Sequence, residues 1–281
     1  MGRTALTTLV LLALLIGGGG LLWLLARSGS LLARIGTPAL FGALLLAAWQ
    51  AACVGYDVPR VLLPPPSAIA RAFAAHLPML GADFVQTVLR AVLPGYAIGC
   101  AAGFAAALLL DRSDFMRRGV MPMASLVSAM PIVGIAPIMV MWFGFDWPSK
   151  AAVVVVMTFF PMLVQATAGL AAAGPMERDL MRGYGASYSA TLLRLRLPAA
   201  VPFLFTALKL NATLALIGAI VAEFFGTPIV GMGFRISTEV ARMNLDLVWA
   251  EIALASLTGT LAFAALSLLE RTVAFWHPSF R

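Results

Sequence analysis

Long apolar runs separated by short polar segments dominate the chain. These runs share a length of about 20 residues or more and occupy positions 4–26, 36–56, 84–110, 120–143, 150–172, 199–225 and 247–270. A helix of about 20 apolar residues crosses the ~30 Å hydrocarbon core of a bilayer. The pattern therefore predicts an all-α polytopic membrane protein with a core of six transmembrane helices at 36–270.

The run at 4–26 differs from the other six because Gly17–Gly20 interrupts it. Glycine is costly inside a helix, although it is commoner in membrane helices than in soluble ones. No small-residue cleavage site follows the run, which favours an uncleaved anchor over a secretory signal. We therefore expect an extra N-terminal hydrophobic helix within residues 1–35, ahead of a transmembrane domain at 36–275.

Composition supports a membrane protein, since 62% of the residues are hydrophobic and 11% are charged. An average soluble domain has roughly 45–50% and about 25%. The net charge of +7 resides in short loops and forms no basic stripe with interleaved aromatic residues, so we expect no nucleic-acid partner.

Cysteine and histidine are too sparse for a disulfide framework or a metal cluster. Cys53 and Cys100 both fall inside apolar runs, and His76 and His277 are far apart in the sequence. We therefore expect no metal site. The chain also has no Gly-x-x-x-x-Gly-Lys-[Ser/Thr] loop, so we expect it to bind no nucleotide in that manner.

The distribution of basic residues predicts the orientation, because loops rich in Lys and Arg stay in the cytoplasm. If the segment 173–198 is cytoplasmic, eleven arginines lie inside: Arg27, Arg34, Arg112, Arg117, Arg118, Arg178, Arg182, Arg194, Arg196, Arg271 and Arg281. Six basic residues then lie outside: Arg3, Arg60, Arg71, Lys150, Arg235 and Arg242. This excess predicts a multi-pass protein with a cytoplasmic C-terminal tail at 276–281.

A row of small residues marks one face of the run at 84–110. Gly95, Gly99 and Gly103 recur every four residues, and Ala107 extends the row. Such a stripe lets two helix backbones approach closely. A contact between helices of one subunit is the favoured interpretation, and a contact between subunits is the alternative.

The polar segment at 173–198 is organised like two short amphipathic helices joined by a turn. Pro175 suits the start of a helix, and Glu177 and Asp179 suit its positive end. Leu180, Tyr184 and Tyr188 would share one face at a spacing of four.

The turn and the second short helix are predicted from three further residues. Gly185 permits a sharp turn, and Ser187 suits the N-cap of a helix that ends before Pro198. Two such helices would form a rigid knob for another protein, while a helix lying on the lipid surface is the alternative.

These residues resemble a known family. The Gly185-Ala186-Ser187 step, the run to Leu197-Pro198, and the Val221-Ala222-Glu223 motif are similar to the cytoplasmic-loop signature of binding-protein-dependent ABC importer permeases. The resemblance implies that the segment 173–198 is a coupling loop that docks on an ATPase subunit.

One part of the signature differs from the family pattern. Where the family has Glu-Ala-Ala before the glycine, this chain has Asp179, Leu180 and Met181, so the docking surface differs in detail. The resemblance implies coupling roles for ten residues: Glu177, Asp179, Leu180, Met181, Tyr184, Gly185, Ala186, Ser187, Leu197 and Pro198.

Further motifs resemble the nitrate, sulfonate and taurine branch of these permeases. They are the proline-rich 63–69, then 136–137, 142–144, 148–150 and 159–161. The resemblance covers about residues 60–275 and implies a bacterial inner-membrane protein. It also implies a cytoplasmic ATPase dimer that binds ATP and Mg²⁺, an external or periplasmic solute-binding protein, a second permease copy, and surrounding membrane lipid.

Four polar residues inside the predicted spans are candidates for the transport path or its gate: Gln165, Lys209, Asn211 and Glu223. Lys209 and Glu223 are fourteen residues apart, about 21 Å along a helix, and cannot pair with each other. We favour a structural pair or snorkelling for Lys209 and helix-to-helix hydrogen bonding for Gln165 and Asn211, while gating or packing of the outer mouth remains open for Glu223.

Two other function classes compete with the importer. An ion-coupled secondary transporter is also polytopic, but it often shows inverted repeats, and the chain has no pair of matching halves. A membrane enzyme would need catalytic groups at one membrane depth, so a transport subunit is favoured. The motifs at 143–148 and 223–228 resemble members that take up pyrimidines or thiamine precursors more than those that take up sulfonates.

Overall fold

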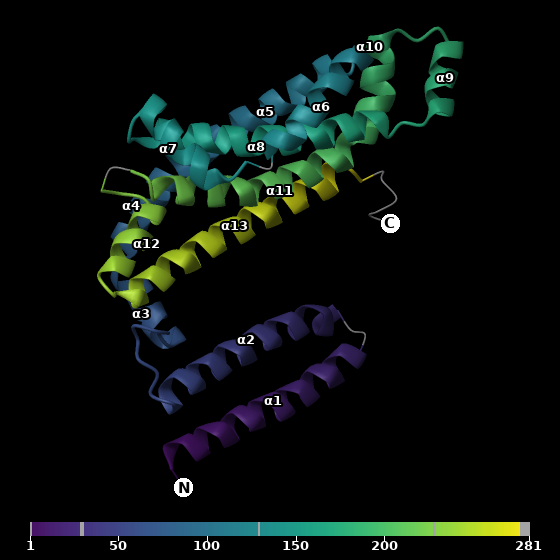
Figure 1. Cartoon of the computed structure of the whole chain (residues 1–281). Helices are drawn as coiled ribbons and strands as arrows, with labels where there is room; N and C mark the ends of the chain where they lie inside the picture. The colour runs from purple at the N-terminus through teal and green to yellow at the C-terminus, as the bar shows by residue number, and fades with distance from the viewer. Residues whose placement is uncertain (1, 29–30, 129, 227–228, 276–281) are drawn as a thin grey trace. The chain divides into compact units, whose positions relative to one another are not determined.

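The chain folds into helices joined by short loops (Figure 1). The computed structural model describes residues 2–28, 31–128, 130–226 and 229–275, and no strand occurs in these ranges. The expected tail at 276–281, with His277 and Arg281, and the Thr227-Pro228 end of one motif lie outside the described residues. Side-chain placements of Arg3, Arg34 and Arg117 also lie outside them.

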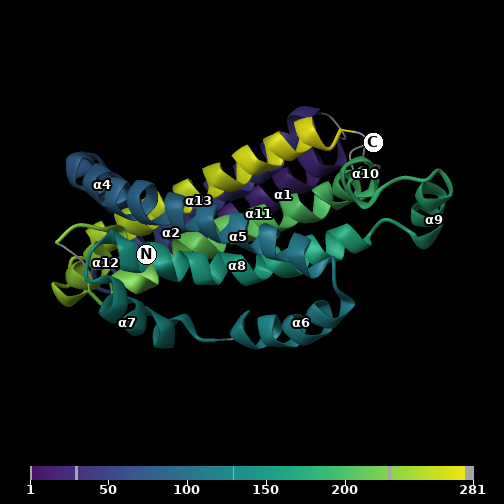
Figure 2. The same ribbon diagram turned by 90° about the horizontal axis from the view of Figure 1, so that it is seen from above.

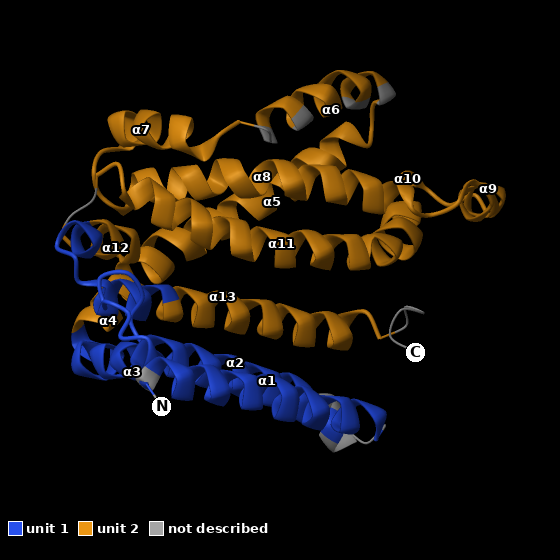
Figure 3. Ribbon diagram, turned by 60° about the horizontal axis from the view of Figure 1, so that its bottom comes forward, with its two compact units in different colours: residues 1–78, 238–252 blue, residues 79–237, 253–281 orange. Residues whose placement is uncertain are grey.

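The chain divides into two compact units, residues 1–78 with 238–252 and residues 79–237 with 253–281 (Figure 3). The first unit contains α1 (Arg3–Arg27), α2 (Leu31–Gly55) and α3 (Pro66–Ala75). It also contains the end of α12 (Met232–Ala241) and the start of α13 (Leu245–Val273).

In the first unit, α1 and α2 pack side by side. The Thr8 hydroxyl lies 3.1 Å from the Tyr56 hydroxyl, and the Trp49 and Trp249 rings meet edge to face at 5.1 Å. The glycine run at 17–20 does not interrupt α1, because a helix in hydrocarbon must satisfy its backbone groups internally whatever its side chains are.

The second unit holds the larger helical assembly. Its elements are α4 (Leu77–Phe84), the π-helical segment η1 (Val85–Val92), α5 (Leu93–Leu110), α6 (Asp114–Ser128), α7 (Ile132–Phe143), α8 (Trp147–Ala171), α9 (Pro175–Gly183), α10 (Tyr188–Thr191), the π-helical segment η2 (Leu192–Arg196), α11 (Leu197–Glu223) and the remaining parts of α12 and α13.

Six helical segments within the described ranges are long and apolar enough to cross a membrane. They are 4–27, 36–55, 77–110, 147–171, 188–223 and 245–273. The all-α polytopic prediction is therefore confirmed. Five of the six spans predicted at 36–270 meet the length and hydropathy requirement, and so does the N-terminal segment with the glycine run.

The single span predicted at 120–143 is wrong. Two shorter helices, α6 and α7, take its place, and they follow each other along α8 (Figure 2). Pro131 has an extended backbone at ψ 125° immediately before α7. Proline has no N–H to continue a helix and disfavours the helical conformation in the residue before it. The run ends its first helix before Pro131, whereas Pro122 and Pro137 lie inside α6 and α7.

Two other prolines are accommodated without a break. The N–H of Leu93 bonds the Val88 carbonyl and the N–H of Leu197 bonds the Leu192 carbonyl, each five residues back. These π turns lie just before Pro94 and Pro198, where the wider hydrogen-bond spacing accommodates the missing proline N–H. The predicted end of the second short helix before Pro198 is therefore wrong, since the helix continues from Tyr188 to Glu223.

The row of small residues on α5 packs against α8 of the same chain. A Cβ added at Gly95 would lie 2.7 Å from the Ala151 carbonyl oxygen, and one at Gly99 would lie 2.8 Å from the Val155 carbonyl oxygen. Both distances are shorter than a van der Waals contact. The favoured interpretation, a helix contact within one subunit, is confirmed.

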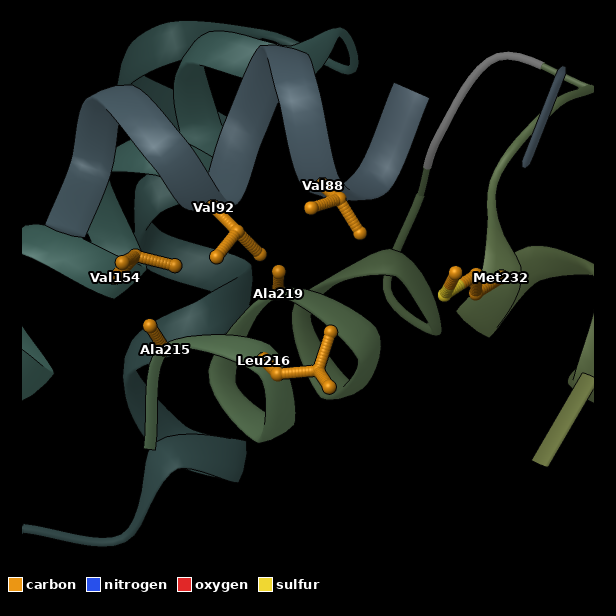
Figure 4. Packing of buried hydrophobic residues seen from close by; sticks show 7 residues of the cluster. All are labelled: Val88, Val92, Val154, Ala215, Leu216, Ala219 and Met232. Carbon is orange, nitrogen blue, oxygen red and sulfur yellow. The ribbon is translucent and has the colours of Figure 1, made fainter. Parts of the chain in front are cut away.

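A buried apolar cluster joins η1, α8, α11 and α12 (Figure 4). It consists of Val88, Val92, Val154, Ala215, Leu216, Ala219 and Met232. The small residues Ala215 and Ala219 are fully buried and allow close packing of α11. This cluster fixes the end of α11 that carries Glu223.

Substitution of Gly99 by leucine tests the α5–α8 contact. We expect the added side chain to separate the helices and to lower the free energy of unfolding by about 1–3 kcal/mol, measured by unfolding in mild detergent. Gly42→Leu is the matched control, because nothing lies within 4 Å of a Cβ added there. Equal stability of both variants would contradict the assigned packing.

Candidate functional site

The segment 173–198 projects from one end of the second unit (Figure 1). Its first helix, α9, begins at Pro175 as predicted, with Glu177 in the first turn and Arg182 in the last. None of its residues is buried. Met176, Leu180 and Tyr184 are 78%, 59% and 79% exposed, so an apolar face stands outside the helix bundle with no cover from the described chain.

The apolar face differs from the predicted one in its third member. α9 ends at Gly183, and Tyr188 belongs to α10, so Leu180, Tyr184 and Tyr188 do not share one helix. The four-residue spacing holds only while a helix continues, and Gly185 ends it. Met176, four residues before Leu180, replaces Tyr188 on that face.

The turn at Gly185 is a Schellman motif, the common C-terminal cap of helices. Gly185 has φ +70°, its N–H donates to the Arg182 carbonyl at 2.9 Å, and the Ala186 N–H donates to the Met181 carbonyl at 3.0 Å. The left-handed conformation favours glycine, since a side chain is strained there. The predicted sharp turn is confirmed.

Ser187 caps α10, as predicted. Its Oγ accepts a hydrogen bond from the Ala190 N–H at 3.3 Å. Beyond it, Leu197 and Pro198 are half-buried within the continuous helix. Asp179 pairs with Arg182 at 3.1 Å, with both side chains mostly exposed, so this pair contributes little to stability.

A largely buried ion pair anchors the base of the projecting segment. The Arg196 guanidinium donates to both Asp111 carboxylate oxygens at 2.5–2.6 Å, and its Nε donates to the Leu170 carbonyl at 2.9 Å. The Tyr188 hydroxyl also donates to Asp111 at 2.8 Å. These bonds join the ends of α5, α8 and η2.

Sequence reasoning missed Asp111 as a site residue and used Arg196 only to predict orientation. The available signal was an acid directly after an apolar run, combined with an arginine just before another run. Such a pair could only be assigned once the two ends were known to meet, because 85 residues separate them.

Lys209 and Glu223, predicted not to pair with each other, have separate partners. The Lys209 ammonium donates to Glu270 of α13 at 2.7 Å. The sequence favoured either a structural pair or snorkelling for Lys209, and the structure has the pair.

Asn211 is buried where α5, α8 and α11 meet. Its amide donates to the Thr158 carbonyl at 2.8 Å and contacts the Cys100 sulfur at 3.3 Å. Gln165 is half-buried on α8, and in the part of the chain that the structure describes its side chain makes no hydrogen bond.

Glu223 belongs to a buried polar network at the opposite end of α11. It accepts hydrogen bonds from the Thr87 hydroxyl at 2.8 Å and from the Gly233 N–H at 2.7 Å. The Thr87 hydroxyl in turn accepts from the Met232 N–H at 2.9 Å. A carboxylate beside these N–H groups stabilises the N-terminus of α12.

Asp83 completes this network and was missed by sequence reasoning. Its carboxylate is fully buried, accepts from the Gly231 N–H at 2.6 Å and pairs with Arg235 at 2.9 Å. The Gly231-Met232-Gly233 step leads into the short helix α12. An added Cβ at Gly233 would meet the Ile220 carbonyl, so the backbones approach closely there.

The start of α8 is fixed by Asp146 and Lys150. Asp146 caps the helix by accepting from the Trp147 N–H at 2.7 Å, and this bond, with one from Gln86, holds the pKa of the Asp146 carboxyl below its usual value. Its contribution to stability is therefore present above the ordinary pKa and is lost as the pH falls through the lowered value. The buried Lys150 ammonium donates to the carbonyls of Phe145 and Gly226.

Metal ligands are not gathered anywhere in the described residues, where no group of three His, Cys, Asp or Glu side chains could hold an ion. The site therefore consists of a projecting knob, an anchored base and a polar network at the far end of one long helix.

Comparison with known proteins identifies the family of this chain. Residues 95–275 match the binding-protein-dependent transport system inner membrane component. The chain belongs to this family. It is therefore a multi-pass inner-membrane permease subunit of an ABC importer for small solutes, not an enzyme, and its family implies an ATPase and a solute-binding protein as partners.

The relatives match most of this chain and nearly all of their own length. A probable ABC transporter permease of Haemophilus influenzae is 31% identical over 241 residues, which cover 85% of this chain and 98% of that protein. The formylaminopyrimidine transport permease of Halalkalibacterium halodurans is 30% identical over 247 residues, 85% of this chain and 95% of the relative. The taurine transport permease of Escherichia coli is 25% identical over 270 residues, 91% and 92% of the two chains.

Family membership decides between the function classes left open by the sequence. The resemblance to the nitrate, sulfonate and taurine branch is confirmed by these relatives. The ion-coupled secondary transporter is set aside, because relatives matched over nearly their full length are ABC permeases.

A double-mutant cycle tests the anchor of the knob. We expect Arg196→Gln to lower the free energy of unfolding in detergent by about 3–5 kcal/mol, because it leaves the largely buried Asp111 carboxylate without its cation. Arg196→Gln combined with Asp111→Asn should recover much of that loss, since no unpaired charge remains. If the two single losses simply add, the pair is not coupled.

Proposed function

We propose that the segment 173–198 couples this permease to its ATPase and that α9 docks on that subunit in the cytoplasm. The observation that carries the proposal is the exposed apolar face of α9, formed by Met176, Leu180 and Tyr184. An apolar face outside the predicted spans is costly in water. A groove on a partner would cover it, as in other helix-in-groove complexes.

The knob has the stiffness that coupling requires. The hydrogen-bonded turn at Gly185 fixes α9 against α10, and the Arg196–Asp111 pair fixes η2 against α5. A push on α9 would therefore move the long helix 188–223 instead of bending a loose loop.

The remaining parts of the assembly follow from this assignment. A cytoplasmic ATPase dimer would hold ATP and Mg²⁺, and an external or periplasmic binding protein would deliver the solute. The C terminus would be cytoplasmic, as the arginine distribution predicts. Two copies of the 36–275 domain would enclose the path as a homodimer.

Among the four polar candidates in the spans, we assign Gln165 to the wall of the path. Its amide lacks a hydrogen-bond partner among the described side and main chains, which is costly in hydrocarbon but not beside water. Lys209 and Glu223 have partners. The Asn211 amide nitrogen also has one, while its buried Oδ1 has none among the described residues. We assign these three residues to holding helices in place.

Two substitutions in the coupling segment test its role. Gly185→Pro cannot adopt φ +70°, and Asp179→Lys reverses a charge on the exposed helix. We expect each to lower recovery of the ATPase with the tagged permease, and to lower stimulated ATP hydrolysis, by about tenfold or more, the effect of a loss above ~1.4 kcal/mol.

Gly183→Ala is the matched control, because it lies two residues away with no neighbour within 4 Å of the added Cβ. Recovery of a P-loop ATPase is measured by mass spectrometry after purification in mild detergent, and membrane insertion is checked in parallel. Normal ATPase recovery and uptake in both test variants would remove the coupling assignment and favour a helix lying on the lipid.

For the solute, we propose a heteroaromatic ring related to pyrimidines or thiamine precursors. The support is the 30% identity to the formylaminopyrimidine permease, against 25% to the taurine permease, and the motifs at 143–148 and 223–228. Sulfonates, taurine and nitrate are the competing solutes.

Competition during uptake tests the solute. With the complete importer in vesicles, unlabelled formylaminopyrimidine should reduce entry of a labelled pyrimidine precursor at least tenfold more effectively than taurine does. The reverse order would identify an alkanesulfonate importer, while leaving the coupling assignment intact.

A further inference from the structure

A polar cleft of about 860 Å³ opens at the base of the knob, between α9, α10 and the turn after α5. Its walls include four arginines, Arg112, Arg178, Arg182 and Arg196, together with Asp111 and Tyr188. All six belong to the second unit. The coupling proposal uses only the Arg196–Asp111 pair, so the other three arginines need a separate explanation.

Charge pairing divides the arginines into two groups. Arg196 is neutralised by Asp111, and Arg182 pairs with Asp179 on the exposed side. Arg112 and Arg178 form no ion pair with a described carboxylate. The Arg112 guanidinium lies 5.5 Å from the Tyr188 ring, and the Arg178 Nε donates to the Gly174 carbonyl at 3.3 Å.

The two guanidinium groups without carboxylate partners give the cleft an excess of positive charge. Guanidinium groups bind phosphate through several parallel N–H donors, and they do so better than lysine ammonium groups. The cleft therefore suits a phosphate ester.

The position of the cleft favours a lipid phosphate over a free one. Asp111 and Arg112 directly follow the apolar segment 77–110, and Tyr188 begins the apolar segment 188–223. Leu109 and Leu193, each two residues from a lining residue, are both 65% exposed. A headgroup in the cleft would thus have apolar helix surface beside it for its acyl chains.

We propose that this cleft binds the headgroup phosphate of an anionic phospholipid, with Arg112 and Arg178 as its main ligands. The inference goes beyond the proposed function, because it concerns neither the transported solute nor ATPase docking. Anionic lipids are attracted to basic pockets at the ends of transmembrane helices. A bound headgroup would brace α9 against the end of α5.

Native mass spectrometry of the full-length permease tests the site. The probe is an equimolar mixture of phosphatidylglycerol and phosphatidylcholine in mild detergent, and the wild type should retain phosphatidylglycerol. Each arginine near an anionic surface contributes about fivefold in affinity, so Arg112→Gln with Arg178→Gln should lower retention about 25-fold.

Arg60→Gln with Arg71→Gln is the matched control, since it removes the same charge from two exposed arginines of the first unit. Should the cleft double variant fail to fold, Arg112→Gln alone should show a fivefold loss. Equal retention in the cleft and control variants would overturn the proposal.

Two further outcomes would overturn it. Displacement of phosphatidylglycerol by an equal concentration of inorganic phosphate would identify a free-anion site. Full lipid retention with loss of the ATPase in the cleft variant would identify a docking surface for acidic residues. If no ATPase is recovered even with the wild type, the coupling proposal fails while the lipid measurement keeps its meaning.

Discussion

The structure depends on one constraint: a backbone in hydrocarbon has no water to bond, so its N–H and C=O groups must pair within the chain. Proline removes one N–H from that pairing, and the outcome differs from one proline to another. Pro161 and Pro202 lie inside α-helices. At Pro94 and Pro198 the preceding turns widen to a five-residue spacing and the helix continues. At Pro131 an extended residue ends the rod, and α6 and α7 lie in sequence along α8.

The close packing of the second unit follows from small residues at fixed spacing. Lipid tails provide no hydrophobic drive for helices to associate, so contact between backbones supplies van der Waals attraction instead. Gly95 and Gly99 bring α5 onto the α8 backbone, and Gly169 brings α8 close to Ala200 and Phe203 of α11. Because α8 packs against α5 on one side and α11 on the other, the position of α11 is fixed. The polar contacts near its two ends, Arg196 with Asp111 and Glu223 with Thr87, therefore have defined geometry.

Local chemistry was predictable from the sequence, and long-range pairing was not. The helix start at Pro175, the turn at Gly185 and the cap at Ser187 depend on neighbouring residues, and each is confirmed. Apolar periodicity could not show that Pro131 would end a span. Nor could it show that Asp83 meets Arg235, 152 residues away, because that contact depends on how the helices pack.

The length of α11 has a mechanical consequence. Its 27 residues extend about 40 Å at 1.5 Å per residue, from the base of the projecting segment to the carboxylate that holds α12. A tilt of about 5° around its midpoint would displace each end by about 2 Å, enough to break the 2.7 Å bond between Glu223 and the Gly233 N–H. On the coupling proposal, a small rotation of α11 at the end beside the projecting segment would therefore break the Glu223–Gly233 hydrogen bond at the other end.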